Sequence, residues 1–201
     1  MHLSIESEIA QTAAALVVDE GFEYGPAKRR ALKQLGLPAR TALPNNERVE
    51  EAVREHLALF CADTQPGELQ VLRRLALLWM ERMAAFRPYV GGPVWHGTAT
   101  RLSDIYLQLF CDDSKSAEIA LINRGVDYDA HTVRGLHGQP VEALSIGCPS
   151  TELGLMVGVH LLIYDLDDLR GALRADACGR TPRGDAAALH QLLQNGQEFE
   201  P

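Results

Sequence analysis

The chain has 201 residues, of which 46% are hydrophobic and 23% are charged; this composition is typical of a globular protein of one domain or two small units. The formal net charge is −8, and the acidic excess lies in residues 89–201, which hold 8 Lys and Arg against 15 Asp and Glu. Duplex DNA binding needs clustered positive charge, so that partner is not expected. Since no apolar leader and no apolar run of about 18 residues occurs, we expect a cytoplasmic protein without a membrane span.

Four helices are expected in the first half of the chain. Apolar residues recur every three or four positions up to Glu20, with Ser4 as the N-cap and Gly21 as the stop. Three more helices are predicted over 26–36, from Asn45 or Asn46 to Phe60, and from Pro66 to Met83. These four helices predict a helical lobe over residues 1–88.

One basic cluster interrupts this acidic chain. It consists of Lys28, Arg29, Arg30 and Lys33 on the second predicted helix. Such a cluster suits either a nucleic-acid contact or a solvated helix face, and both interpretations stay open at this point.

From Pro88 onward the apolar pattern changes to the period of two that strands show. Strands are predicted over 94–97, 103–111, 126–133, 140–146 and 156–164. Helices are predicted over 115–124, from the acidic residues 165–168 to 173, and over 185–193. The turn from Gly135 to Gly138 indicates a hairpin between the third and fourth strands. We therefore predict an α+β fold, with the helical lobe packed on a mixed-sheet lobe over residues 89–201.

The functional prediction depends on a motif within residues 94–110. Gly97-Thr98 is followed by Ser103-Asp104 at the start of a predicted strand. This arrangement resembles the signature of the polymerase-β-type nucleotidyltransferase superfamily, in the form of small proteobacterial nucleotidyltransferase-like proteins. That signature is a Gly-Ser or Gly-Thr pair followed by a strand that begins Ser-Asp-x-Asp. Here Tyr106 stands where the second carboxylate belongs, so the resemblance is to a degenerate motif.

The resemblance implies a role for each residue that matches the motif. Gly97, Thr98 and Ser103 are expected to bind a nucleotide, and Asp104 is expected to serve as catalytic carboxylate and Mg²⁺ ligand. Glu142, on a later strand, is the candidate for the remaining catalytic and metal-binding carboxylate, with Asp165 as a second choice. Nucleotidyl transfer needs carboxylates that bind metal ions together, because the metal ions bridge the phosphate oxygens and activate the attacking hydroxyl.

Simpler interpretations of the same residues stay open. Asp104 suits a strand-entry cap, Gly97-Thr98 suits a plain turn, and Glu142 suits a solvated edge. The alternative function is a non-catalytic protein-interaction or regulatory module on the same scaffold. An ATP-dependent ligase of the UDP-N-acetylmuramate–alanine type is not indicated, because the chain has no GxxxxGK[ST] loop.

The cysteines and histidines do not suggest a zinc site. The four cysteines are widely separated with no CxxC pair, and the seven histidines form neither HxH nor HExxH. His96 and His160 are the two histidines near the predicted site. The apolar surroundings of His160 favour a position in the core.

Overall fold

The computed structural model describes residues 4–136, 138–175 and 179–197. The chain forms two compact units, Met1–Gly67 and Glu68–Pro201, and each is considered by itself. The first unit is helical and the second contains a mixed sheet, so the predicted α+β class is confirmed. No helix in the described ranges has the length and apolar content needed to cross a membrane.

The first unit is built from three helices, α1 (Ile5–Glu20), α2 (Tyr24–Gln34) and α3 (Asn46–Phe60). Their ends follow the capping residues of the sequence. The side chain of Ser4 accepts a hydrogen bond from the Ser7 backbone N–H, and that of Asn45 accepts one from Arg48. Gly21 ends α1 in the left-handed conformation that glycine adopts readily. The buried core between the helices contains many alanines, which let the helix backbones approach closely.

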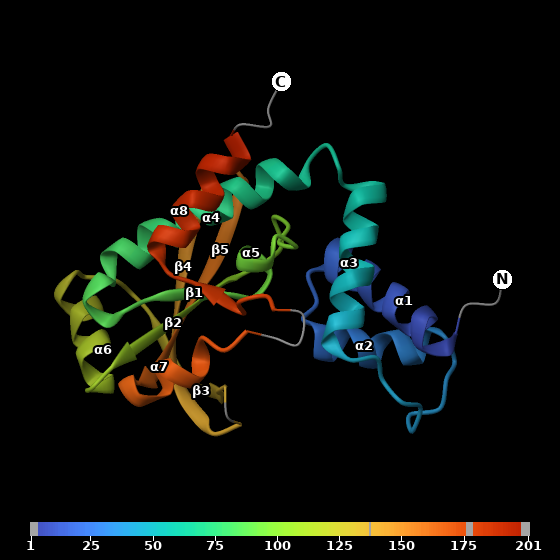
Figure 1. Ribbon diagram of the computed structural model, residues 1–201, viewed down its shortest axis with the longest axis horizontal. Coiled ribbons are helices and arrows are strands. Elements are labelled where there is room, and N and C mark those ends of the chain that lie inside the picture. Colours follow the sequence, from blue (N-terminus) through green and yellow to red (C-terminus); the bar gives the residue numbers. More distant parts are fainter. Residues whose placement is uncertain (1–3, 137, 176–178, 198–201) are drawn as a thin grey trace. The chain divides into compact units, whose positions relative to one another are not determined.

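The second unit contains a six-stranded sheet in the order β3-β4-β5-β2-β1-β6 (Figure 1). The strands are β1 (Tyr89–Gly91), β2 (Ile105–Cys111), β3 (Asp129–Arg134), β4 (Pro140–Ser150), β5 (Leu155–Asp165) and β6 (Arg183–Gly184). β2 and β5 run parallel to each other, and all other neighbouring strands are antiparallel. The predicted hairpin between the third and fourth strands is present as β3 and β4.

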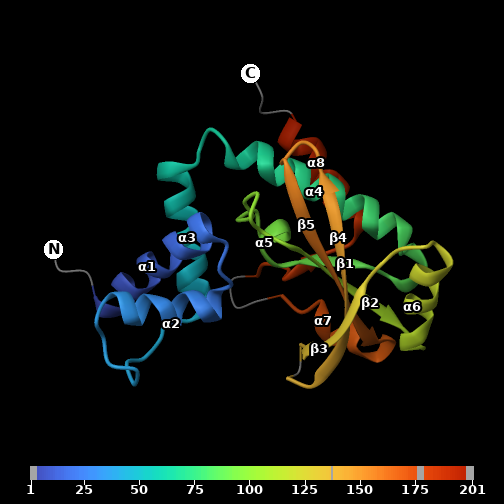
Figure 2. The ribbon, with the colours of Figure 1, turned by 180° about the vertical axis from the view of Figure 1, so that it is seen from behind.

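One face of this sheet is the apolar core. Side chains of alternating residues, such as Leu107 in β2 and Leu161 in β5, are fully buried there. They pack against apolar residues of α4 (Gln65–Arg82), α6 (Ser114–Asn123) and α8 (Ala186–Gln197). Figures 1 and 2 show α4 running across the strands. Because most of α4 packs on the sheet, the division between the units falls within the first turn of this helix, after Gly67, whereas the sequence predicts a boundary at 88 and 89.

The opposite face is covered in part. Phe110, Tyr164 and Ala172 form a small buried cluster there, beneath the short 3-10 turn Leu166–Asp168 and α7 (Leu169–Ala172). Farther along the same face, Tyr106 and His160 are only partly buried. The sheet therefore has one closed face and one half-open face, and we call the latter the open face.

Two short elements differ from the sequence prediction. Residues 94–97, predicted as a strand, belong to the helix α5 (Gly92–His96), which has proline in its first turn and ends at Gly97 with φ of 82°. The strand at this place is β1, which lies just before the helix and has only three residues. The two-residue strand β6 was not predicted, since so short a segment has no measurable period.

We expect Leu107→Ala to lower the free energy of unfolding by about 2–5 kcal/mol, because Leu107 is 0% exposed on the closed face. Leu102→Ala is the matched control, since Leu102 is 41% exposed and its loss should change the free energy by no more than about 0.5 kcal/mol. Urea denaturation of both variants measures the difference. Equal costs would contradict the assignment of this face as the core.

Candidate functional site

The Gly97-Thr98 turn directs its backbone donors inward. The N–H groups of Gly97, Thr98 and Ala99 all donate to the carbonyl of Pro93, at 2.9, 2.9 and 3.2 Å. They close the end of α5 and are therefore already used, in contrast to the phosphate-binding role that the resemblance implies for this turn. The hydroxyl of Thr98 differs, because Oγ1 is buried and has no hydrogen-bond partner within the described residues.

A partly buried cation lies against the same turn. A Cβ placed on Gly97 would lie 3.6 Å from Nη2 of Arg73, so the guanidinium is in van der Waals reach of this glycine. The Nε of Arg73 donates to the carbonyl of Val94 at 3.2 Å. Burial lowers the pKa of Arg73 from its ordinary value. The hydrogen bond to Val94 in α5 thus holds Arg73 beside the Gly97-Thr98 turn.

Ser103 serves the chain itself. Its hydroxyl accepts a hydrogen bond from the Thr100 N–H at 3.0 Å, while its own N–H donates to the Thr100 carbonyl at 2.8 Å. These two bonds form the tight turn that leads into β2. The nucleotide-binding role expected for Ser103 therefore competes with a structural one.

Asp104 joins β2 to β5 through its carboxylate. Oδ1 accepts a hydrogen bond from the Gly158 N–H at 3.1 Å, and Oδ2 lies 3.1 Å from Nε2 of His160. A Cβ at Gly158 would lie 2.6 Å from Oδ1, so only glycine leaves room for the carboxylate. The side chain of Asp104 is 45% exposed, and it therefore also faces solvent.

His160 extends this contact across the open face. Its Nδ1 lies 2.7 Å from Oγ of Ser145 in β4, and its ring stacks on Tyr106 with centroids 4.9 Å apart and planes at 25°. A carboxylate only accepts hydrogen bonds, so we assign the proton of the neutral ring to Nε2, and Nδ1 then accepts from the Ser145 hydroxyl. Asp104, Tyr106, His160 and Ser145 form one continuous polar network, the open-face network, over β2, β5 and β4.

Glu142 lies elsewhere, and the expected pair of carboxylates is not formed. Its Cα pairs with that of Ile163, one of the core-facing residues of β5, whereas Ser145 pairs with His160. Glu142 therefore projects from the opposite face to Asp104, because paired residues share a face. Its carboxylate lies 2.9 Å from Nζ of Lys115 in α6, and this hydrogen bond raises the pKa of Lys115.

The second choice, Asp165, is a cap. Its Oδ1 accepts a hydrogen bond from the Asp167 N–H at 3.0 Å, at the start of the turn that precedes α7. Asp113 likewise caps α6 by accepting from Lys115. Both carboxylates therefore have a local structural role.

The residues around Asp104 do not fit a Mg²⁺ site. Mg²⁺ prefers six oxygen ligands in octahedral geometry, whereas Asp104 is flanked by a phenol and an imidazole, and both of its oxygens have protein partners. Among the residues that the structure describes, no three His, Cys, Asp or Glu side chains converge into a metal-binding group. The open-face network is thus built from hydrogen bonds and a ring contact.

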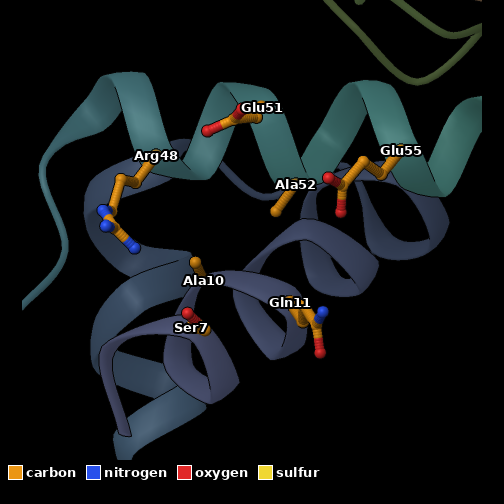
Figure 3. A pocket seen from close by; sticks show the side chains of 7 residues that line it. All are labelled: Ser7, Ala10, Gln11, Arg48, Glu51, Ala52 and Glu55. Carbon is orange, nitrogen blue, oxygen red and sulfur yellow. The ribbon is translucent and has the colours of Figure 1, made fainter. Parts of the chain in front are cut away.

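The hollows on the surface of the first unit include two that are lined by charged side chains. One, of about 200 Å³, lies between α1 and α3, where Figure 3 shows Arg48, Glu51 and Glu55 from α3 with Ser7 and Gln11 from α1. The cation of Arg48 is paired with Glu6 at 3.7 Å, and the hollow has a mixed polar rim that favours no ligand class.

The second hollow includes part of the basic cluster. Phe22, Pro26, Arg29, Arg30 and Lys33 line a space of about 310 Å³. Arg30 stacks over Phe22 at 5.3 Å and pairs with Glu20 at 3.7 Å, while Lys28 donates to Pro44 and Asn46. Two of the four basic residues thus stabilise their own unit, as a solvated helix face does.

Sequence reasoning missed the role of His160 and Ser145. The signal that places them is the period of two: Val157, Val159 and Leu161 face the core, so His160 must face the other way. The same alternation turns Ser145 outward between Leu144 and Ile146. What alternation alone does not give is the register that brings the two side chains together.

We expect Asp104→Asn to move the ring proton of His160 from Nε2 to Nδ1. The Asn oxygen must still accept from Gly158, so its NH₂ group faces Nε2, which then has to act as acceptor. Long-range ¹H–¹⁵N NMR of the imidazole reads the tautomer. Ser145→Ala is the control and should leave the proton on Nε2; an unchanged tautomer in Asp104→Asn would overturn the assigned hydrogen-bond directions.

Comparison with known proteins finds only partial structural neighbours. No protein-family profile and no curated protein match the chain. Matching solved structures include the Cid1 poly(U) polymerase with MgGTP bound, at 13% identity over 50% of this chain and 32% of that chain, and Cid1 with the UTP analogue UMPNPP, at 11% identity over 73% and 42%. The TM-score is 0.32 for both, and the chain spans less than half the length of either.

Proposed function

We propose that this chain binds a nucleotide on the open face of its sheet and does so without a Mg²⁺ clamp held by the protein. The observation that carries the proposal is the open-face network, in which the half-exposed carboxylate of Asp104 is fixed between Gly158 and His160. Such a fixed carboxylate presents its free lone pairs to the amino or imino groups of a base.

The surroundings of Asp104 suit the same class of ligand. The stacked rings of Tyr106 and His160 offer a flat, partly exposed surface beside the carboxylate. The hydroxyl of Thr98 is buried without a partner within the described residues. This unused hydroxyl supports a polar ligand near the entry of β2.

The proposal separates binding from catalysis. Transfer of a nucleotidyl group by two metal ions needs converging carboxylates, and here Asp104 and Glu142 lie on opposite faces of the sheet. The network has only one carboxylate, held by an imidazole. We therefore propose a nucleotide-binding protein that does not catalyse two-metal transfer.

Calorimetric titration with ATP, GTP, CTP and UTP tests the proposal. We expect heat with at least one nucleotide, and we expect it to persist when EDTA replaces Mg²⁺, because no metal-binding group of the protein takes part. Absence of heat with all four would favour the non-catalytic interaction module. If EDTA abolishes the heat of binding, nucleotide binding depends on a metal ion held by the protein, and the proposal is wrong on this point.

Two carboxylate substitutions locate the binding face. Asp104→Ala should weaken nucleotide binding about tenfold or more, since a hydrogen bond to a charged group contributes roughly 1.5–3 kcal/mol. Glu142→Ala removes the same charge from the closed face and should leave the affinity unchanged. Equal losses in the two variants would contradict the assignment of the ligand to the open face.

A further inference from the structure

A single row of residues crosses the open face, with one residue from each strand. The Cα pairings place these residues in register from one edge of the sheet to the other: Asp129, Ser145, His160, Tyr106, Gly91 and Arg183. Since paired residues share a face, Arg183 projects from the same face as the open-face network. The two ends of the row carry opposite charges, with a carboxylate in β3 and a guanidinium in β6.

Arg183 is a buried cation for which no ion pair is formed with the residues that the structure describes. It is only 9% exposed, and its Nε and Nη1 are buried with no hydrogen-bond partner among the described residues. Burial lowers the pKa of Arg183, and the neighbouring Tyr164 opposes that change. A guanidinium has five donors in a rigid fork, so leaving two of its nitrogens unpaired is unfavourable unless a ligand or an ordered water supplies the acceptors.

The residue between Arg183 and the network is a glycine. A Cβ on Gly91 would lie 3.6 Å from the amide nitrogen of Gln108, 3.6 Å from the carbonyl oxygen of Pro182 and 3.9 Å from Cβ of Arg183, so the Gln108 and Arg183 side chains both lie beside Gly91. Strands lie about 4.8 Å apart, and two spacings put Arg183 about 10 Å from Tyr106 along the row. The open face therefore has the rings of Tyr106 and His160 and the Asp104 carboxylate at one place, and the guanidinium of Arg183 two strands away.

We propose that Arg183 binds the phosphate group of the nucleotide, and that the nucleotide lies along the row with its base over the open-face network. This inference rests on the proposed function. The guanidinium fork can donate two parallel hydrogen bonds to phosphate oxygens. In the opposite orientation the phosphate would lie near Asp129 and Asp104, whose negative charges would repel it. The phosphate is thus bound by a side chain of β6, while the N–H groups of the Gly97-Thr98 turn remain bonded to Pro93.

Titration of Arg183→Met and Arg183→Lys tests the inference. The probes are the nucleotide that gives the strongest heat with the wild-type chain, its nucleoside, and inorganic triphosphate. We expect Arg183→Met to weaken nucleotide binding at least tenfold, Arg183→Lys to fall between it and the wild type, and nucleoside binding to stay unchanged. Arg124→Met is the control: Arg124 is exposed at the end of α6, on the closed side, and its loss should leave all affinities unchanged.

Stability separates a binding role from a structural one. Without ligand, Arg183→Met should be at least as stable as the wild type toward urea, because the substitution removes an unpaired buried charge. A destabilised variant with unchanged nucleotide affinity would overturn the inference.

The outcomes also separate this inference from the proposed function. If the wild type binds nucleotide and Arg183→Met binds it equally well, the inference fails and the proposed function stands. If the wild type binds inorganic triphosphate but no nucleotide, and Arg183→Met loses the triphosphate, the proposed function fails while the anion site at Arg183 stands. If the wild type binds none of the probes, both fail.

Discussion

The parallel pairing of β2 with β5 is the constraint on which the rest of this structure depends. It sets Tyr106 beside His160 and brings Asp104 to the backbone of Gly158. The same pairing assigns the alternate residues of both strands, such as Leu107 and Leu161, to the core. A shift of one residue would exchange the two sets, burying the polar side chains and exposing the apolar ones. Core and network are therefore two results of one register.

Local rules of the sequence were enough for much of the fold. The caps at Ser4 and Asn45, the stop at Gly21 and the alternation in 103–111 each depend on neighbouring residues, and each appears as predicted. The segment 94–97 was predicted wrongly, because a pattern of only four residues is compatible with both a strand and a single helical turn. The proline in the first turn and the left-handed conformation of Gly97 favour the helix.

The site was harder to predict for a physical reason. Asp104 was found from its motif, but the face on which Glu142 lies depends on the pairing of β4 with β5, which connects residues far apart in the chain. A pattern with a period of two gives the faces of one strand relative to each other and not relative to another strand. His160 was assigned to the core because its neighbours are apolar, although its own position in the alternation points outward. Arg183 lies in a strand too short to show any alternation.

The glycine at 158 has a consequence for how the sequence can vary. Its missing side chain is the space that the Asp104 carboxylate occupies, so even alanine there would push the acid away from the strand. The dependence runs in one direction, since a larger residue at 158 would displace the carboxylate, whereas a smaller residue at 104 would leave the glycine unaffected. In a set of natural relatives, loss of this glycine should therefore accompany loss of the acid, and such a coordinated change would mark the branches in which the exposed sheet surface has acquired another use.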